Sequence, residues 1–197
     1  MSMQPQHGYT LEAYFALEQA SEIRYEYWQG DVFAMSGASP AHAQIQVNLI
    51  TLLRVQLRGR PCRVFPSDIR LKVPSLPPYR YPDLSALCGE PVFELIGGLE
   101  VLVNPTLIVE ILSPTTEAFD RGDKFTHYKS TPSFCEYLLM AQHRPHVGQY
   151  IKQSDAIWSY QEFNDLSAVL YVPALDCRLG LEELFQDVVF PTASPPQ

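Results

Sequence analysis

The run TLIVEILSP, residues 106–114, is the feature that most limits how this chain can fold. Leucine, isoleucine and valine fill five of its first seven positions, as in a buried strand, yet Glu110 lies among them. A buried carboxylate is costly unless it pairs with an arginine, lies at a solvated strand end or binds a metal ion. Ser113 and Pro114 end the run soon after Glu110. We therefore expect Glu110 near the carboxyl end of its strand, where ligand sites of α/β sheets gather.

A second acid, Asp83, opens the apolar run DLSALC, residues 83–88. If this strand is an antiparallel neighbour of the strand with Glu110, the start of one meets the end of the other. Two carboxylates that close repel each other unless a divalent cation joins them. The pair thus predicts a site for Mg²⁺, which prefers oxygen ligands, with Mn²⁺ as a substitute.

The N-terminal third predicts a helix, a hairpin and a longer helix. Thr10 is a suitable cap for a helix over residues 9–20, and residues 24–35 read as two short strands joined by a turn at residues 29–31. Ser39 as a cap and Pro40 at the first helical position predict a helix that ends near Gly59.

The rest of the chain alternates strands and helices. We expect a strand over 62–73 with a break or bend at Pro66, then strands over 83–88 and 106–112 with a loop (89–105) between them. We further expect a helix over 118–131, a strand over 133–141, an antiparallel pair over 146–153 and 166–175, and a short helix over 181–186. The order helix, three strands, helix, strand predicts an α/β core. It carries an N-terminal helix and hairpin and a C-terminal antiparallel extension. A right-handed crossover would make the strands over 106–112 and 133–141 parallel.

Composition indicates a globular chain, since 46% of its 197 residues are hydrophobic and 18% are charged. We expect a single domain over residues 1–190 and a disordered tail over 191–197. No apolar run approaches the roughly 20 residues of a membrane span, and no export signal is visible. A cytoplasmic protein without a membrane partner is therefore expected, with its four scattered cysteines as reduced thiols.

Half of the fourteen basic residues fall between positions 54 and 80, where Asp68 is the only acid. The net charge of −8 argues against passive coating of nucleic acid, but a basic stretch in an acidic chain can face phosphates. A solvated face that keeps the protein soluble is the alternative. The residues assigned to DNA contact on this hypothesis are Arg54, Arg58, Arg60 and Arg63.

Several of these motifs together resemble a known family. They are residues 24–49, YPDLSAL at 81–87, PTLIVEILSP at 105–114, and the spacing of Asp120, Lys124 and Tyr128. In this order they resemble the PD-(D/E)xK nuclease superfamily, and more closely its Uma-two-type restriction endonuclease family, over about residues 10–190. The resemblance implies that Asp83 and Glu110 are catalytic metal ligands, with the main-chain carbonyl of Ile111 as a third. It also implies a restriction-endonuclease-like fold for the α/β core, Mg²⁺ as cofactor and DNA as substrate.

The sequence departs from the superfamily pattern at Leu112, where the usual lysine stands two residues after the second acid. Either activity is lost or another lysine replaces it. We predict that Lys124 is the catalytic replacement, since it lies one turn into the following helix and four residues after Asp120. The alternative is that Lys124 only pairs with Asp120 on the surface.

Five further residues are candidates for the surroundings of the site. Each has an ordinary alternative as an exposed strand residue, a helix cap or a core side chain. They are Glu26, His42, Gln44, Asp120 and Tyr128.

Three function classes fit these observations. A metal-dependent DNA endonuclease explains the acids, the basic stretch and the resemblance together. A catalytically silent nucleic-acid-binding or interaction protein explains Leu112 without a replacement lysine. A hydrolase of small phosphate esters is the third class. A homodimer is expected because twofold dimers are the commonest assembly.

Overall fold

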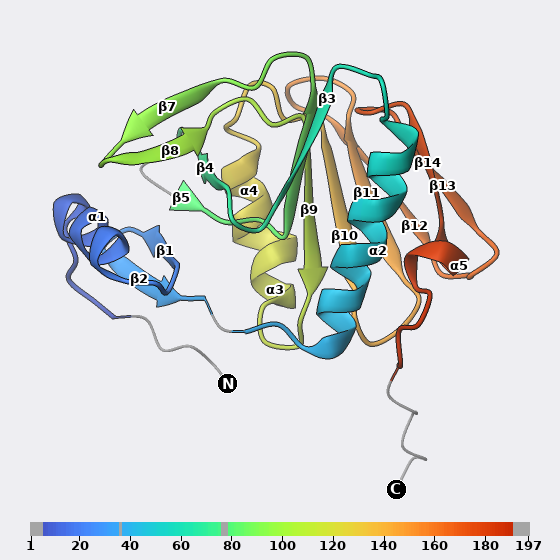
Figure 1. Cartoon of the computed structure of the whole chain (residues 1–197), viewed down its shortest axis with the longest axis horizontal. Helices are drawn as coiled ribbons and strands as arrows, with labels where there is room; N and C mark the ends of the chain where they lie inside the picture. Colours follow the sequence, from blue (N-terminus) through green and yellow to red (C-terminus); the bar gives the residue numbers. More distant parts are fainter. Residues whose placement is uncertain (1–5, 36, 76–78, 191–197) are drawn as a thin grey trace, which may run out of the picture.

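The computed structural model describes residues 6–35, 37–75 and 79–190, and its strands form two six-stranded sheets and one separate hairpin (Figure 1). The predicted tail over 191–197 lies outside the described residues. The N-terminal sheet has the order β2-β1-β5-β4-β8-β7, and the central sheet has the order β12-β11-β10-β9-β6-β3. The protein is thus mixed α/β, as predicted.

Each of the two large sheets contains strands from distant parts of the sequence. The N-terminal sheet contains β1 (Tyr25–Trp28), β2 (Asp31–Ala34), β4 (Arg70–Lys72), β5 (Tyr79–Arg80), β7 (Phe93–Ile96) and β8 (Leu99–Leu102). The central sheet contains β3 (Cys62–Pro66), β6 (Leu84–Cys88), β9 (Leu107–Leu112), β10 (Glu136–Ala141), β11 (Val147–Lys152) and β12 (Trp158–Phe163). The separate hairpin is β13 (Val169–Val172) and β14 (Cys177–Gly180).

The helices begin where the capping residues predict. Thr10 Oγ1 accepts from the amide of Ala13 at the start of α1 (Leu11–Ala20), and Ser39 Oγ accepts from the amide of His42 at the start of α2 (Pro40–Gln56). The remaining helices are α3 (Glu117–Phe119), the π-helical η1 (Asp120–Lys124), α4 (Phe125–Tyr128) and α5 (Leu181–Leu184).

Strand β9 lies inside the central sheet, antiparallel to β6 and parallel to β10. Both orientations were predicted. Leu84 pairs with Val109, and continuing that register by one residue brings Asp83 opposite Glu110. The two acids are therefore neighbours across adjacent strand ends, as the sequence suggested.

Two helical segments cover opposite faces of β9. Val109 and Ile111 lie in the cluster that includes Ile45 and Leu49 of α2. The alternate residues of β9, Ile108 and Leu112, pack in a second cluster with residues of α4. Because Glu110 shares the face of Ile108 and Leu112, it points toward the helix that follows the strand.

The predicted helix over 118–131 forms, but with one widened turn. Segments α3, η1 and α4 run on from one another, and Asp120–Lys124 is π-helical. A spacing of four residues slightly exceeds the 3.6-residue turn of an α-helix, and a widened turn takes up the excess. Asp120, Lys124 and Tyr128 can thereby stay on one face.

Three strand predictions were wrong. The strand predicted over residues 62–73 does break at Pro66, where β3 ends, but the two parts are not one strand because β3 and β4 belong to different sheets. The predicted loop over 89–105 contains the β7–β8 hairpin. At the C-terminus the predicted partners do not pair, since β11 pairs with β12 and β13 pairs with β14.

The expectation of four reduced thiols was also wrong. Cys62 on β3 and Cys88 on β6 face each other in register and form a disulfide, whereas Cys135 and Cys177 are free. Cys62 and Cys88 are 26 residues apart in the sequence, and their pairing depends on strand register, which the sequence alone does not show. Among the described residues, no helix is long and apolar enough to cross a membrane.

Candidate active site

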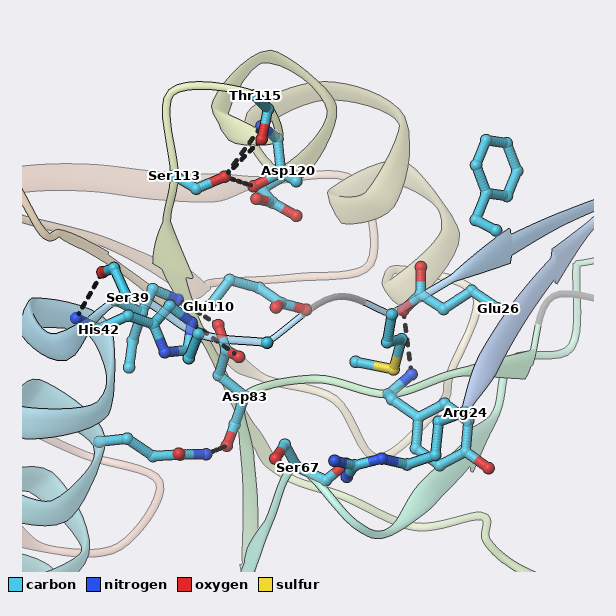
Figure 2. A pocket seen from close by; sticks show the side chains of 18 of the residues that line it. Arg24, Glu26, Ser39, His42, Ser67, Asp83, Glu110, Ser113, Thr115 and Asp120 are labelled. Atoms are coloured by element: carbon cyan, nitrogen blue, oxygen red, sulfur yellow. Dashed lines mark hydrogen bonds and ion pairs between the residues drawn. The ribbon is translucent and has the colours of Figure 1, made fainter. Parts of the chain in front are cut away.

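A pocket of about 680 Å³ lies at the carboxyl end of β9, between the two large sheets. Asp83 and Glu110 line it together with the first turn of α2 and residues of the N-terminal hairpin. Figure 2 shows His42, Asp83 and Glu110 on one side of the pocket and Glu26 on the other. The acids predicted from separate strands therefore share one cavity.

Asp83 is held in place by three neighbours. Its Oδ2 accepts a hydrogen bond from the main-chain amide of Ile111 at 2.7 Å, and its Oδ1 lies 3.1 Å from His42 Nε2. Gln46 Nε2 donates to the carbonyl of Asp83 at 2.7 Å. The N-terminal part of α2 thus fixes the strand end that carries the acid.

Glu110 is 3% exposed and is held from the opposite face of the sheet. Its Oε1 accepts from the Tyr128 hydroxyl at 2.7 Å and lies 2.8 Å from Lys124 Nζ. Its Oε2 has no hydrogen-bond partner among the described residues. One carboxylate oxygen is therefore fixed by the helix and the other is open to a ligand.

Lys124 lies among three carboxylates from three different elements. Its Nζ is 2.8 Å from Glu110, 3.5 Å from Glu26 and 3.6 Å from Asp120. The side chain is 8% exposed, so it does not form a solvated surface pair with Asp120. The structure excludes that alternative and places Lys124 directly against Glu110.

Burial and charge shift the pKa values of this group in opposite ways. Burial raises the pKa of Glu110 well above its usual range, and Asp120 and Asp83 add to the rise while Lys124 opposes it. Burial acts to lower the pKa of Lys124, but the three carboxylates around it outweigh that effect and raise it. The carboxylates around Lys124 therefore favour its charged form.

The donor set fits a hard divalent cation. Among the described residues, no three His, Cys, Asp or Glu side chains form a cluster spaced for a metal ion. Mg²⁺, however, is commonly bound through one or two carboxylates and keeps several waters. Asp83 and the open oxygen of Glu110 meet this requirement, and Ile111 lines the same pocket. An ion there would also relieve the repulsion that raises the pKa of Glu110.

The structure brings together most of the surrounding candidates. Glu26, His42 and Asp120 line the pocket, and Tyr128 lies behind it on Glu110. Gln44 does not reach this pocket. It donates to Asn48 Oδ1 at 2.9 Å on another face of α2. Gln46 contacts Asp83 instead, and its spacing of four residues from His42 was a signal for the shared face.

The four arginines assigned to DNA contact lie toward the C-terminal end of α2 or beyond it, whereas the pocket adjoins its N-terminal end. Arg54, Arg58 and Arg63 are exposed. Arg60 is already engaged, since it donates to the carbonyls of Leu175 and Asp176 at 2.6 and 3.1 Å. Their contact with DNA stays a prediction, and they do not line the pocket.

The basic stretch also contains residues that do not face solvent. Arg70 and Arg80 are 2% and 0% exposed and lie near Glu18 and Glu26, at 3.7 and 3.5 Å. The sequence analysis assigned no role to Arg80. The sequence of a basic stretch does not show which of its residues are buried. The burial of Arg80 is therefore visible only in the fold.

Chemically, the site combines an acidic pair suited to an ion, a permanently charged lysine on one of those acids, and an open cavity. These are the components used to bind a phosphate, activate a water molecule and stabilise negative charge that develops during hydrolysis.

Comparison with known proteins agrees with this geometry. The family model Uma2, described as "Putative restriction endonuclease", matches residues 11–182. Two proteins of Synechocystis sp. (strain ATCC 27184 / PCC 6803 / Kazusa), the uncharacterized proteins slr1290 and sll1609, are each 34% identical to this chain. The matches cover 91% of this chain and 92% of slr1290, and 78% of this chain and 86% of sll1609.

A solved structure shares the fold. It is a "putative nuclease belonging to DUF820" from Anabaena variabilis ATCC 29413, with a TM-score of 0.70 and 19% identity. The match covers 86% of this chain and 93% of that one. The restriction-endonuclease-like fold is thus confirmed, and family and fold together support a nuclease function. The chain belongs to the Uma2 family of restriction-endonuclease-like proteins.

Proposed function

We propose that the protein is a Mg²⁺-dependent endonuclease that hydrolyses phosphodiester bonds in DNA. The observation that carries the proposal is the placement of Asp83 opposite Glu110, with Lys124 Nζ 2.8 Å from Glu110. The family match supports the same function class.

Each residue has a separate part in the proposed reaction. Asp83, Glu110 and the carbonyl of Ile111 would hold Mg²⁺, which supplies a more acidic water and stabilises charge on the phosphate. His42 and the Ile111 amide orient Asp83. Lys124, kept protonated by its neighbours, stabilises negative charge as it develops at the phosphate.

The position of Leu112 does not favour a silent protein. Leu112 is fully buried in the cluster that contains Phe125 and Tyr128, so it is part of the core. Lys124 reaches the same face of β9 from the helix packed against it. A cation is therefore present at Glu110 even though the usual strand position lacks one.

Cleavage of supercoiled plasmid with and without Mg²⁺ or Mn²⁺ tests the proposal. We expect metal-dependent nicking or linearisation that is lost in Asp83→Asn and Glu110→Gln, and kept in the exposed control Asp123→Asn from the same helix. Calorimetry should show one divalent ion bound to the wild type and weaker binding in both site variants.

Two other outcomes would contradict the proposal. Metal binding without cleavage of double- or single-stranded DNA would favour a silent nucleic-acid-binding or interaction protein. Hydrolysis of small phosphate esters together with indifference to DNA would favour the small-ester hydrolase.

A further inference from the structure

Arg80 on β5 is a fully buried charge with few partners. Its Nη1 donates to the carbonyl of Tyr27 at 3.3 Å and lies 3.5 Å from Glu26 Oε2. Its Nε and Nη2 are buried and have no hydrogen-bond partner among the described residues. A guanidinium held in this way is costly, and the cost calls for a role that a neutral side chain would not fill.

The walls around Arg80 leave Glu26 as its counter-ion. The guanidinium carbon lies 5.5 Å from the ring centre of Trp28 and 5.3 Å from that of Phe119. These rings exclude water and offer only a weak attraction for the cation. Glu26 is the carboxylate found within ion-pair distance of Arg80 among the described residues.

Glu26 in turn connects Arg80 to the site. Its Oε2 faces Arg80, while its Oε1 lies 3.5 Å from Lys124 Nζ and accepts from the main-chain amide of Tyr81 at 3.1 Å. Lys124 then contacts Glu110. The charges therefore alternate in a continuous series from Arg80 through Glu26 and Lys124 to Glu110.

The charge balance explains why the series needs Arg80. Five carboxylates line the pocket, those of Glu22, Glu26, Asp83, Glu110 and Asp120. Arg24 and Lys124 line it as cations, and Arg80 adds a third positive charge from behind Glu26. The remaining formal charge of about −2 matches one divalent ion. Without Arg80 a buried excess of negative charge would remain, and Glu26 would lose the partner that holds its Oε2 in place.

We propose that Arg80 is a positioning residue, which aligns Glu26 so that Glu26 holds the Lys124 ammonium against Glu110. The catalytic consequence rests on the proposed nuclease function. The positioning of Lys124 does not, and it can be measured without any cleavage.

The first experiment follows the Lys124 ammonium by ¹⁵N–¹H NMR of lysine side chains. A buried, ion-paired ammonium should give a protected signal, assigned by its absence in Lys124→Ala. We expect Arg80→Met to shift or broaden this signal. Arg70→Met is the matched control, since Arg70 is also buried on the neighbouring strand but lies near Glu18 instead of Glu26. It should leave the Lys124 signal unchanged.

The second experiment measures cleavage at saturating Mg²⁺ in a double-mutant cycle. Loss of a residue that orients a catalytic group typically costs about 10- to 100-fold in activity. We expect Arg80→Met to lower kcat by about that factor with little change in KM, and Arg80→Lys to restore part of it. Because Arg80 acts through Glu26, adding Arg80→Met to Glu26→Gln should change kcat by less than about twofold.

The outcomes separate the two proposals. A folded Arg80→Met protein with an unchanged Lys124 signal overturns the role of Arg80, whatever the activity. A wild type that cleaves nothing while its Lys124 signal responds to Arg80→Met overturns the function and supports the positioning role. If Arg80→Met does not fold, the Lys124 signal of Arg80→Lys and the activity of the double variant Glu26→Gln/Arg80→Met test the proposal instead. A double variant far less active than Glu26→Gln overturns the proposal.

Discussion

In the proposed site, Lys124 supplies from the helix the positive charge that the superfamily pattern places on the strand. On a strand, residues two apart share a face, so the usual lysine and Glu110 point to the same side. That side packs against α4, and η1 delivers Lys124 to the same acid. What the site requires is a cation at Glu110, and either element can supply it.

Lys124→Ala tests this role directly. We expect the variant to fold and to bind the divalent ion, since neither proposed metal-binding side chain is removed. Cleavage should fall at least ~10²-fold, the scale for losing one preorganised electrostatic group. Plasmid cleavage and metal calorimetry measure the two effects separately.

The control is Lys129→Ala. Lys129 is exposed, and its Nζ lies 4.9 Å from the ring centre of Phe125, outside the pocket lining. The Lys129→Ala variant removes one positive charge from the same region, but Lys129 does not contact Glu110. Equal loss of activity in both variants would show that Lys124 acts only through general charge.

Glu136 links the stability of the protein to pH. It is 1% exposed, and it accepts hydrogen bonds from Gln149 and from the amide of Ala174. Burial raises its pKa to about 7 against the lowering effect of these two donors. Between its unfolded pKa and pH 7 the folded state binds more protons, so the free energy of unfolding falls as pH rises through this window.

Glu136→Gln should therefore remove part of this pH dependence. The part expected to disappear is on the order of 2–3 kcal/mol between pH 4.5 and pH 8. Urea unfolding at several pH values measures it, with the exposed Glu162→Gln as control. An unchanged slope would mean that Glu136 ionises in the folded protein as readily as in the unfolded chain.

At the scale of elements, local signals predicted well what they control. The caps Thr10 and Ser39, Pro40 and the apolar run at β9 gave the starts of two helices and the buried strand. The same run located Glu110, and the order of elements placed Asp83 beside it. The helix starts and the buried strand depend on residues close together in the chain, and the pairing of Asp83 with Glu110 followed from the order of the elements.

Features that depend on distant partners were missed. The pairing of β11 with β12, and of β13 with β14, is a choice among strands of similar composition. The burial of Arg70 and Arg80 depends on Glu18 and Glu26, more than 50 residues earlier. The sequence shows charge but not which charges will meet.

The disulfide between β3 and β6 makes a prediction about these two elements. Closing a loop across 26 residues stabilises the folded state by on the order of 3 kcal/mol. We expect reductant to lower the free energy of unfolding by this amount in the wild type and not in Cys62→Ala/Cys88→Ala. Thiol titration of the denatured, unreduced protein should detect two free cysteines. Detection of four would contradict the disulfide.

The whole molecule carries its charges unevenly. Acidic residues outnumber basic ones in the pocket lining. Among the described residues, the basic side chains that line it are Arg24, His42 and Lys124. The exposed Arg54 lies near the C-terminal end of α2 and the exposed Arg58 just after that end, and neither lines the pocket. If DNA extends along this helix, two separate regions would bind it, one through the metal ion and one through phosphates.

Salt dependence tests that arrangement. If Arg54 and Arg58 contact phosphates, replacing each with glutamine should reduce the slope of log K against log salt by about one. Cleavage of saturating substrate should be unaffected, because neither residue lines the pocket. An unchanged slope in both variants would mean that Arg54 and Arg58 are solvated surface residues.

The predicted homodimer likewise stays a prediction, and light scattering at micromolar concentration decides it.

The position of the pocket between the two large sheets has a mechanical consequence. Asp83 adjoins the central sheet and Glu110 lies in it, whereas Glu26 lies in the N-terminal sheet. Three segments that pass from one sheet to the other, represented by Ser39, Ser67 and Tyr81, line the cavity. A small rotation of one sheet against the other would widen or narrow the cavity without breaking a strand pair. Lys124, which contacts acids of both sheets, would resist that rotation, so one side chain would link the movement of the sheets to the geometry of the pocket.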